Sequence, residues 1–196
     1  LYRASKLNNP DGNTAYWANA AQAAADFITQ NNKQSYPYRL YNTGNPENDY
    51  YECFTTNPVY NNEIILARSV WNTNQVEKVF LPVGFTGSFS GNGRTNPTQN
   101  LVDAYEMSNG KRIDENGSTY DAANPYKDRD PRLAQTIFYQ GMMWGRADKE
   151  ERRAIDVRYN SDADKAVDYT SAMGGTYTGY YLKKFVNNIS CKEPAT

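Results

Sequence analysis

The sequence predicts a mainly α-helical chain with a large irregular, loop-rich part and a few short strands. Three observations lead to this fold class. An alanine-rich helix is expected over Tyr16–Gln30, the glycine-punctuated segment Val79–Leu101 lacks any regular periodicity, and the best strand is the short run Tyr180–Val186. With 196 residues, of which 39% are hydrophobic, the chain is long enough for about one domain with its own core.

The helix over Tyr16–Gln30 has a start signal and an apolar face. Residues 8–12 have turn chemistry, and Asn13 or Thr14 can cap the first amide groups of the helix. Its apolar face is made by Ala20, Ala24, Phe27 and Ile28. Because alanines let a second helix approach closely, this face is suited to a stacked helix-pair repeat.

Two shorter helices are predicted where a capping residue precedes a proline. The first has Asn96 as N-cap and Pro97 at the first helical position, and the second begins at Asp130-Pro131 in the same way. The buried stripe of the first is expected from Leu101, Val102, Tyr105 and Met107. Around the second, Asp128 can pair with Arg132, and Arg129 with Asp130.

Two longer segments differ in charge. Val79–Leu101 holds one charge, at Arg94, and its glycines alternate with Phe80, Phe85 and Phe89, which predicts an ordered irregular loop. Residues 146–168 are dense in charges of both signs, a pattern typical of a solvated face.

Composition removes several function classes. The chain has no histidine, which excludes Ser–His–Asp and Cys–His catalytic machinery and imidazole zinc ligands. A net charge of −1 offers no electrostatic basis for binding nucleic acid. No apolar run reaches the roughly 18 residues of a membrane helix. Cys53 and Cys191 could form a disulfide, although two unbridged thiols are the favoured interpretation.

A series of short segments follows a recognisable order along almost the whole chain. They are Tyr16–Ala24, Asn62–Ile65, Asn96–Met107 with Asn109-Gly110, Tyr120-Asp121, Asn124–Tyr126, Asp128–Leu133 and Thr178–Phe185. In this order they resemble the SusD/RagB family of Bacteroidetes outer-membrane lipoproteins. Asn96–Met107 and Arg129–Leu133 are the most specific of them.

The resemblance implies part of a SusD-like tetratricopeptide α-superhelix. Residues 1–70 would be a helical scaffold piece and residues 71–196 a loop-rich, ligand-facing region of the same larger domain. The family's lipid-bearing cysteine and outer helices find no match here, so we expect a central fragment whose membrane anchor lies outside it. No cofactor or metal is implied.

The resemblance also implies a function. Family members are non-catalytic proteins of the outer membrane, at the cell surface, that capture oligosaccharide and deliver it to a SusC-like TonB-dependent transporter. The chain is therefore expected to bind a glycan without turning it over.

Sugar binding requires aromatic rings beside polar side chains, since the apolar face of a pyranose stacks on a ring and its hydroxyls need hydrogen-bond partners. Trp71 next to Asn72, and Trp144 near Arg146, meet this requirement and are the predicted ligand-binding residues. Tryptophan is often buried, so core packing is the competing interpretation for both indoles. Trp17 is expected to pack along its helix.

Two other functions stay open from the residues alone. One is a secreted carbohydrate-active enzyme that uses a carboxylate pair such as Asp103 and Glu106. A glycosidase, however, needs two carboxyl groups about 5–9.5 Å apart on either side of the scissile bond, and adjacent helical turns do not secure that. The other is a structural piece whose aromatic residues dock on the transporter. The segment Asp114–Ser118, with Asp121 beyond it, is rich in oxygen ligands and could hold calcium. It lacks the register of an EF-hand, so a plain turn is predicted.

Overall fold

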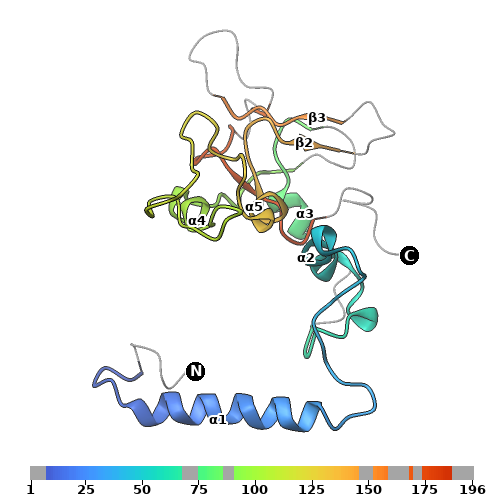
Figure 1. Cartoon of the computed structure of the whole chain (residues 1–196). Helices are drawn as coiled ribbons and strands as arrows, with labels where there is room; N and C mark the ends of the chain where they lie inside the picture. Colours follow the sequence, from blue (N-terminus) through green and yellow to red (C-terminus); the bar gives the residue numbers. More distant parts are fainter. Residues whose placement is uncertain are drawn as a thin grey trace. The chain divides into compact units, whose positions relative to one another are not determined.

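The computed structural model divides the chain into two units, and each is described by itself (Figure 1). The structure describes residues 8–67, 75–85, 91–145, 152–158, 168–169 and 174–186. The first unit comprises residues 1–41 and 58–67, and the second comprises residues 42–57 and 68–196. Short helices, two-residue strands and long irregular segments make up the described part, which confirms the predicted fold class.

The first unit is built around α1 (Thr14–Asn31), with the 3-10 turn η2 (Pro58–Tyr60) on its returning segment. The predicted cap is confirmed, because the Asn13 side chain accepts a hydrogen bond from the Ala15 amide at 3.0 Å. None of the residues of α1 is buried in the structure described, and Phe27 is 43% exposed. Alanine propensity and the cap account for the helix although none of its residues is buried in the described structure.

The second unit carries four helices among its described residues. These are α2 (Pro46–Thr55), α3 (Gln75–Phe80), α4 (Gln99–Asp103) and α5 (Pro131–Thr136). The described helices include none with the length and apolar character that a bilayer crossing demands.

The predicted start of α4 at Asn96 is wrong. Thr98 is the N-cap, and its hydroxyl accepts from the Leu101 amide. The Asn96 side chain instead donates to the carbonyls of Gly93 and Tyr180, at 3.0 and 3.2 Å. Asn96 therefore ties two distant loops together rather than opening a helix.

Two small antiparallel sheets connect the irregular segments. β1 (Ile137–Phe138) pairs with β4 (Tyr181–Leu182), and β2 (Met143–Trp144) pairs with β3 (Arg153–Ala154). The strand expected over residues 180–186 is confirmed only at Tyr181–Leu182, near the start of the predicted run. It ends in a turn in which Phe185 has a φ of 71°, a left-handed conformation incompatible with continued pairing.

The core of the second unit consists of two hydrophobic clusters. The first contains Leu81, Val83, Phe85, Phe138, Trp144, Ile155, Tyr181 and Val186. The second contains Val102, Leu133, Ile137 and Tyr180. Because β1 and β4 contribute to both clusters, this pair of strands joins them into one support for the surrounding loops.

The charged stretch 146–168 is only partly a solvated face. Among its described residues, Asp168 has a fully buried side chain, and it forms an ion pair with Arg153 at 2.7 Å. Burial raises the pKa of the Asp168 carboxyl above its usual value, although Arg153 acts in the opposite direction. The guanidinium of Arg153 also lies 3.8 Å from the centre of the Phe85 ring, so this pair belongs to the packed core.

Candidate functional site

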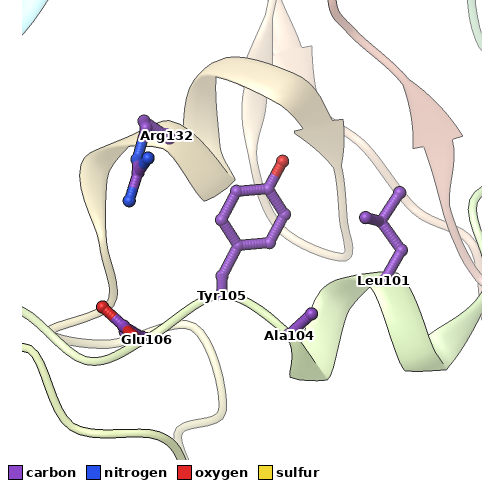
Figure 2. Close-up of a pocket in the computed structure, with 5 residues that line it drawn as sticks. All are labelled: Leu101, Ala104, Tyr105, Glu106 and Arg132. Carbon is purple, nitrogen blue, oxygen red and sulfur yellow. The ribbon is translucent and has the colours of Figure 1, made fainter. Parts of the chain in front are cut away.

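Two pockets lie within the second unit. The first, which we name the Tyr105 pocket, has a volume of about 290 Å³. Its lining residues are Leu101, Ala104, Tyr105, Glu106 and Arg132. Figure 2 shows the Tyr105 ring in the middle of this set, with Leu101 and Ala104 to one side and Glu106 and Arg132 to the other.

The short length of α4 shapes the apolar side of this pocket. Val102 and Met107 are buried as predicted, but Leu101 is 43% exposed. The prediction of a buried Leu101 is wrong because α4 ends at Asp103 and turns only one side of its single turn toward the core. Leu101 thus leaves an apolar surface beside the partly buried Tyr105.

Arg129 fixes the backbone beneath the pocket. Its buried guanidinium donates to the carbonyls of Val102 at 2.7 Å, Tyr105 at 2.8 Å and Pro125 at 2.8 Å. The ion pair expected between Arg129 and Asp130 does not form, because these carbonyls take the guanidinium. Charge-assisted hydrogen bonds of this kind are stronger than neutral ones, so they hold the α4 end in place.

Asp130 caps α5 and orients Arg132. Its carboxylate accepts from the Arg132 amide at 2.8 Å and pairs with the Arg132 guanidinium, which confirms the predicted cap-then-proline start of α5. The Arg132 guanidinium holds the pKa of Asp130 below its usual value, so both groups are charged at neutral pH. Since a guanidinium has five N–H donors, this carboxylate leaves some of them for other acceptors.

The Tyr105 pocket therefore presents a ring, apolar carbons, a guanidinium and the carboxylate of Glu106. Burial raises the pKa of the Tyr105 hydroxyl, which keeps it protonated and able to donate a hydrogen bond at neutral pH. An apolar surface with a few convergent polar groups is typical of a site for a small polar ligand.

The second pocket, which we name the Lys183 pocket, has a volume of about 230 Å³, and its lining residues lie on or beside α2, α5, β2, β3 and β4. It is lined by Asn48 and Tyr51 of α2, Gln135 of α5, Met143, Trp144 and Gly145 at β2, Arg152 before β3, and Lys183 after β4.

Lys183 is held from two sides. Its ammonium group donates to the Ala134 carbonyl at 2.7 Å and lies 5.7 Å from the centre of the Tyr51 ring. The Tyr51 hydroxyl in turn donates to the Val186 carbonyl at 3.2 Å, which anchors α2 to the segment after β4. Burial lowers the pKa of Lys183 to about 8.

Of the four ligand-binding residues predicted from the sequence, Trp144 alone lies in the described part of the chain. Trp144 is 3% exposed, and its ring packs edge-to-face against that of Phe138, with ring centres 4.7 Å apart. Trp144 is thus a core residue that also contributes to the wall of the Lys183 pocket. Trp71, Asn72 and Arg146 lie outside the described residues.

The sequence analysis did not identify Tyr51 and Lys183, which line the Lys183 pocket together with Trp144, or the role of Leu101 in the Tyr105 pocket. Tyr51 lies on α2, whose start at Asn45-Pro46 repeats the cap-then-proline order seen at Asp130-Pro131, and this signal was available in the sequence. Lys183 follows Leu182 in a strand pattern that begins at Tyr180-Tyr181, where alternation turns every second side chain inward. Nothing local indicates the exposure of Leu101.

Asp103 and Glu106, the candidate carboxylate pair, have different surroundings in the structure. Glu106 lines the Tyr105 pocket, whereas Asp103 accepts a hydrogen bond from Gln99 on the same helix at 2.7 Å. Residues 114–118 form the predicted turn, closed by the Ser118 amide and the Glu115 carbonyl at 2.9 Å. Within the described ranges, His, Cys, Asp and Glu residues form no group of three that could hold a metal ion.

Comparison with known families identifies the class of protein. The sequence model of the SusD family matches residues 17–195, and the chain therefore belongs to the SusD family. Among solved structures, the chain is similar to a SusD-like protein from Bacteroides fragilis, with a TM-score of 0.51 and 24% sequence identity. That match covers 77% of this chain and 30% of the Bacteroides protein, so it shows a shared fold over part of a longer relative. A search of curated proteins gave no match.

Proposed function

We propose that this chain is part of a cell-surface glycan-binding protein that captures oligosaccharide and delivers it to a SusC-like TonB-dependent transporter in the outer membrane. The observation that carries the proposal is membership of the SusD family over residues 17–195. Family membership supports glycan binding without catalysis. In this proposal, membrane association comes from a lipid anchor outside these residues.

The Tyr105 pocket supports the proposal on chemical grounds. The ring of Tyr105 and the carbons of Leu101 offer an apolar surface for the C–H face of a sugar. Arg132 and Glu106 supply a donor and an acceptor at the rim, which is what the hydroxyl groups of a sugar require. Trp71 with Asn72, and Arg146 near Trp144, remain proposed as further contacts.

Calorimetry on the full protein tests the proposal. We expect binding of at least one oligosaccharide from a panel of maltoheptaose, xylohexaose and trigalacturonate, and unchanged sugar after prolonged incubation. Arg132→Gln should weaken the binding of such a glycan by about tenfold, the value of one charged hydrogen bond. Arg112→Gln is the matched control, because Arg112 also pairs with an aspartate two residues away, Asp114 at 3.0 Å, but lines neither pocket.

Two outcomes would contradict this function. New reducing ends after incubation would favour the carbohydrate-active enzyme with a carboxylate pair over a binding protein. Failure of every glycan in the panel to bind would leave the family fold without the proposed activity.

A further inference from the structure

The described lining of the Lys183 pocket carries positive charge. It holds two cationic side chains, Arg152 and Lys183, and no carboxylate. Neither cation forms an ion pair with an Asp or Glu of the described residues. Elsewhere in the second unit, Arg132, Arg153 and Arg158 each pair with a nearby aspartate. The two cations of this pocket therefore differ from those three arginines in that no carboxylate of the described residues pairs with them.

The position of Lys183 makes this charge costly. Its ammonium is partly buried, with the carbonyl of Ala134 and the ring of Tyr51 as its surroundings. A carbonyl and a ring each compensate a cation only in part, and burial accordingly disfavours the charged form. An anion entering the pocket would supply the missing opposite charge at a place where water screens it weakly.

The rest of the lining suits a sugar ring. Asn48 and Gln135 bring side-chain amides, which both donate and accept hydrogen bonds, while Tyr51 and Trp144 contribute aromatic surface. The volume of about 230 Å³ is below the roughly 300–1,000 Å³ of pockets that enclose drug-sized ligands. The space is therefore suited to a single sugar residue rather than to a longer stretch of glycan.

We propose that the Lys183 pocket binds one sugar residue that carries an anionic substituent, either a carboxylate or a sulfate ester. Arg152 offers a planar fork that matches the oxygens of such a group, and Lys183 offers a point charge beside it. The inference rests on the proposed glycan-binding function and adds the charge class of the glycan.

Calorimetry with sugars that differ in the presence and type of anionic group tests the inference on the full protein. The three probes are trigalacturonate, its fully methyl-esterified form, and a sulfated carrageenan tetrasaccharide that has no carboxylate. We expect trigalacturonate or the sulfated sugar to bind, and the ester to bind about tenfold more weakly or not at all. Trigalacturonate and the sulfated tetrasaccharide, the first and third probes, distinguish a carboxylate from a sulfate ester.

Substitutions then locate the site. Lys183→Met should weaken binding of the anionic sugar by about tenfold, and Arg152→Gln should act in the same direction. Lys183→Met removes a partly buried charge, so the variant is expected to fold. Lys184→Met is the control, because the Lys184 ammonium lies 3.8 Å from the centre of the Phe54 ring and does not line the pocket.

The outcomes separate this inference from the proposed function. If trigalacturonate binds, equal affinity for it and its ester overturns the anionic pocket. Unchanged affinity for the bound anionic sugar in both Lys183→Met and Arg152→Gln overturns it in every case. Either result leaves glycan binding intact. Binding of neutral sugars alone has the same meaning. Binding of no glycan, neutral or anionic, overturns both.

Discussion

The helix α1 and the core of the second unit are stabilised in opposite ways. α1 has 18 residues and none of them is buried in the described structure, so its stability comes from alanine propensity and one side-chain cap. The second unit has strands of only two residues, yet Phe138 and Tyr181 within them are completely buried. In this chain, therefore, the length of a helix or strand does not determine whether its residues are buried. Both pockets lie in the second unit, which contains the buried hydrophobic clusters.

The largest expected difference between the two regions comes from removing one phenylalanine in each. Phe138→Ala should lower the free energy of unfolding by about 3–5 kcal/mol, because it leaves a cavity beside Trp144. Phe27→Ala should cost less than about 1 kcal/mol, since Phe27 is 43% exposed and its ring centre lies 6.2 Å from that of Tyr38. Urea unfolding followed by circular dichroism measures both, and equal losses would contradict the comparison.

Arg129 provides the next largest effect. Arg129→Met should lower the free energy of unfolding by about 3 kcal/mol, because three carbonyls lose a charged donor beneath the Tyr105 pocket. Arg112→Met, on the exposed turn, should change it by less than about 0.5 kcal/mol. Thermal unfolding of the two variants checks this, and a loss in Arg129→Met no greater than in Arg112→Met would show that the three hydrogen bonds contribute little.

The Lys183 pocket should reveal itself in the pH dependence of stability. The folded pKa is about 8 against an ordinary value of 10.5, so between these pH values the unfolded chain binds the extra proton. Stability should therefore rise with pH from about 8, by at most about 1.4 kcal/mol per unit, while binding of an anionic sugar should fall. Urea unfolding and calorimetry at pH 7.5 and 9.5 measure the two trends.

Lys183→Met supplies the control for both pH trends. The other titratable or charged groups lining the pocket, Tyr51 and Arg152, remain in that variant. Its difference from the unsubstituted chain therefore isolates Lys183. Trends that persist in Lys183→Met would assign them to other groups.

The smallest effects are expected at the helix caps. Asp130→Ala removes the cap of α5 and should cost about 1 kcal/mol in the free energy of unfolding. Asn13→Ala removes the cap of α1 and should mainly reduce local helicity, because α1 has no buried residue in the described structure. Circular dichroism at low urea and the unfolding midpoint distinguish the two effects. Identical shifts of the midpoint would contradict a packing-independent α1.

Elements with strong local signals could be predicted from the sequence. The alanines and Asn13 define α1, and the order Asp130-Pro131 defines the start of α5, because each signal acts within one helical turn. Asn96 carries the same local signal and misleads. Its side chain reaches the carbonyl of Tyr180, 84 residues further along the chain, and no local pattern contains that contact.

The candidate site was harder to predict for the same reason. The sequence predicts an ion pair between Arg129 and Asp130. The Arg129 guanidinium instead donates to the carbonyls of Val102 and Tyr105, which are 27 and 24 residues away. In the sequence, Trp144 lies between two glycines, Gly141 and Gly145. Both adopt positive φ values, 82° at Gly141 before β2 and 99° at Gly145 after it, and the Trp144 ring between them packs on Phe138.

The route of the chain between its two units bears on how the pockets could be isolated in practice. Residues 42–57, which carry Asn48 and Tyr51, are an excursion between the two halves of the first unit. Cutting the polypeptide once, anywhere before residue 75, would either strip the Lys183 pocket of one wall or retain part of the first unit. A minimal fragment that carries both pockets without the first unit would need residues 58–67 replaced by a short splice.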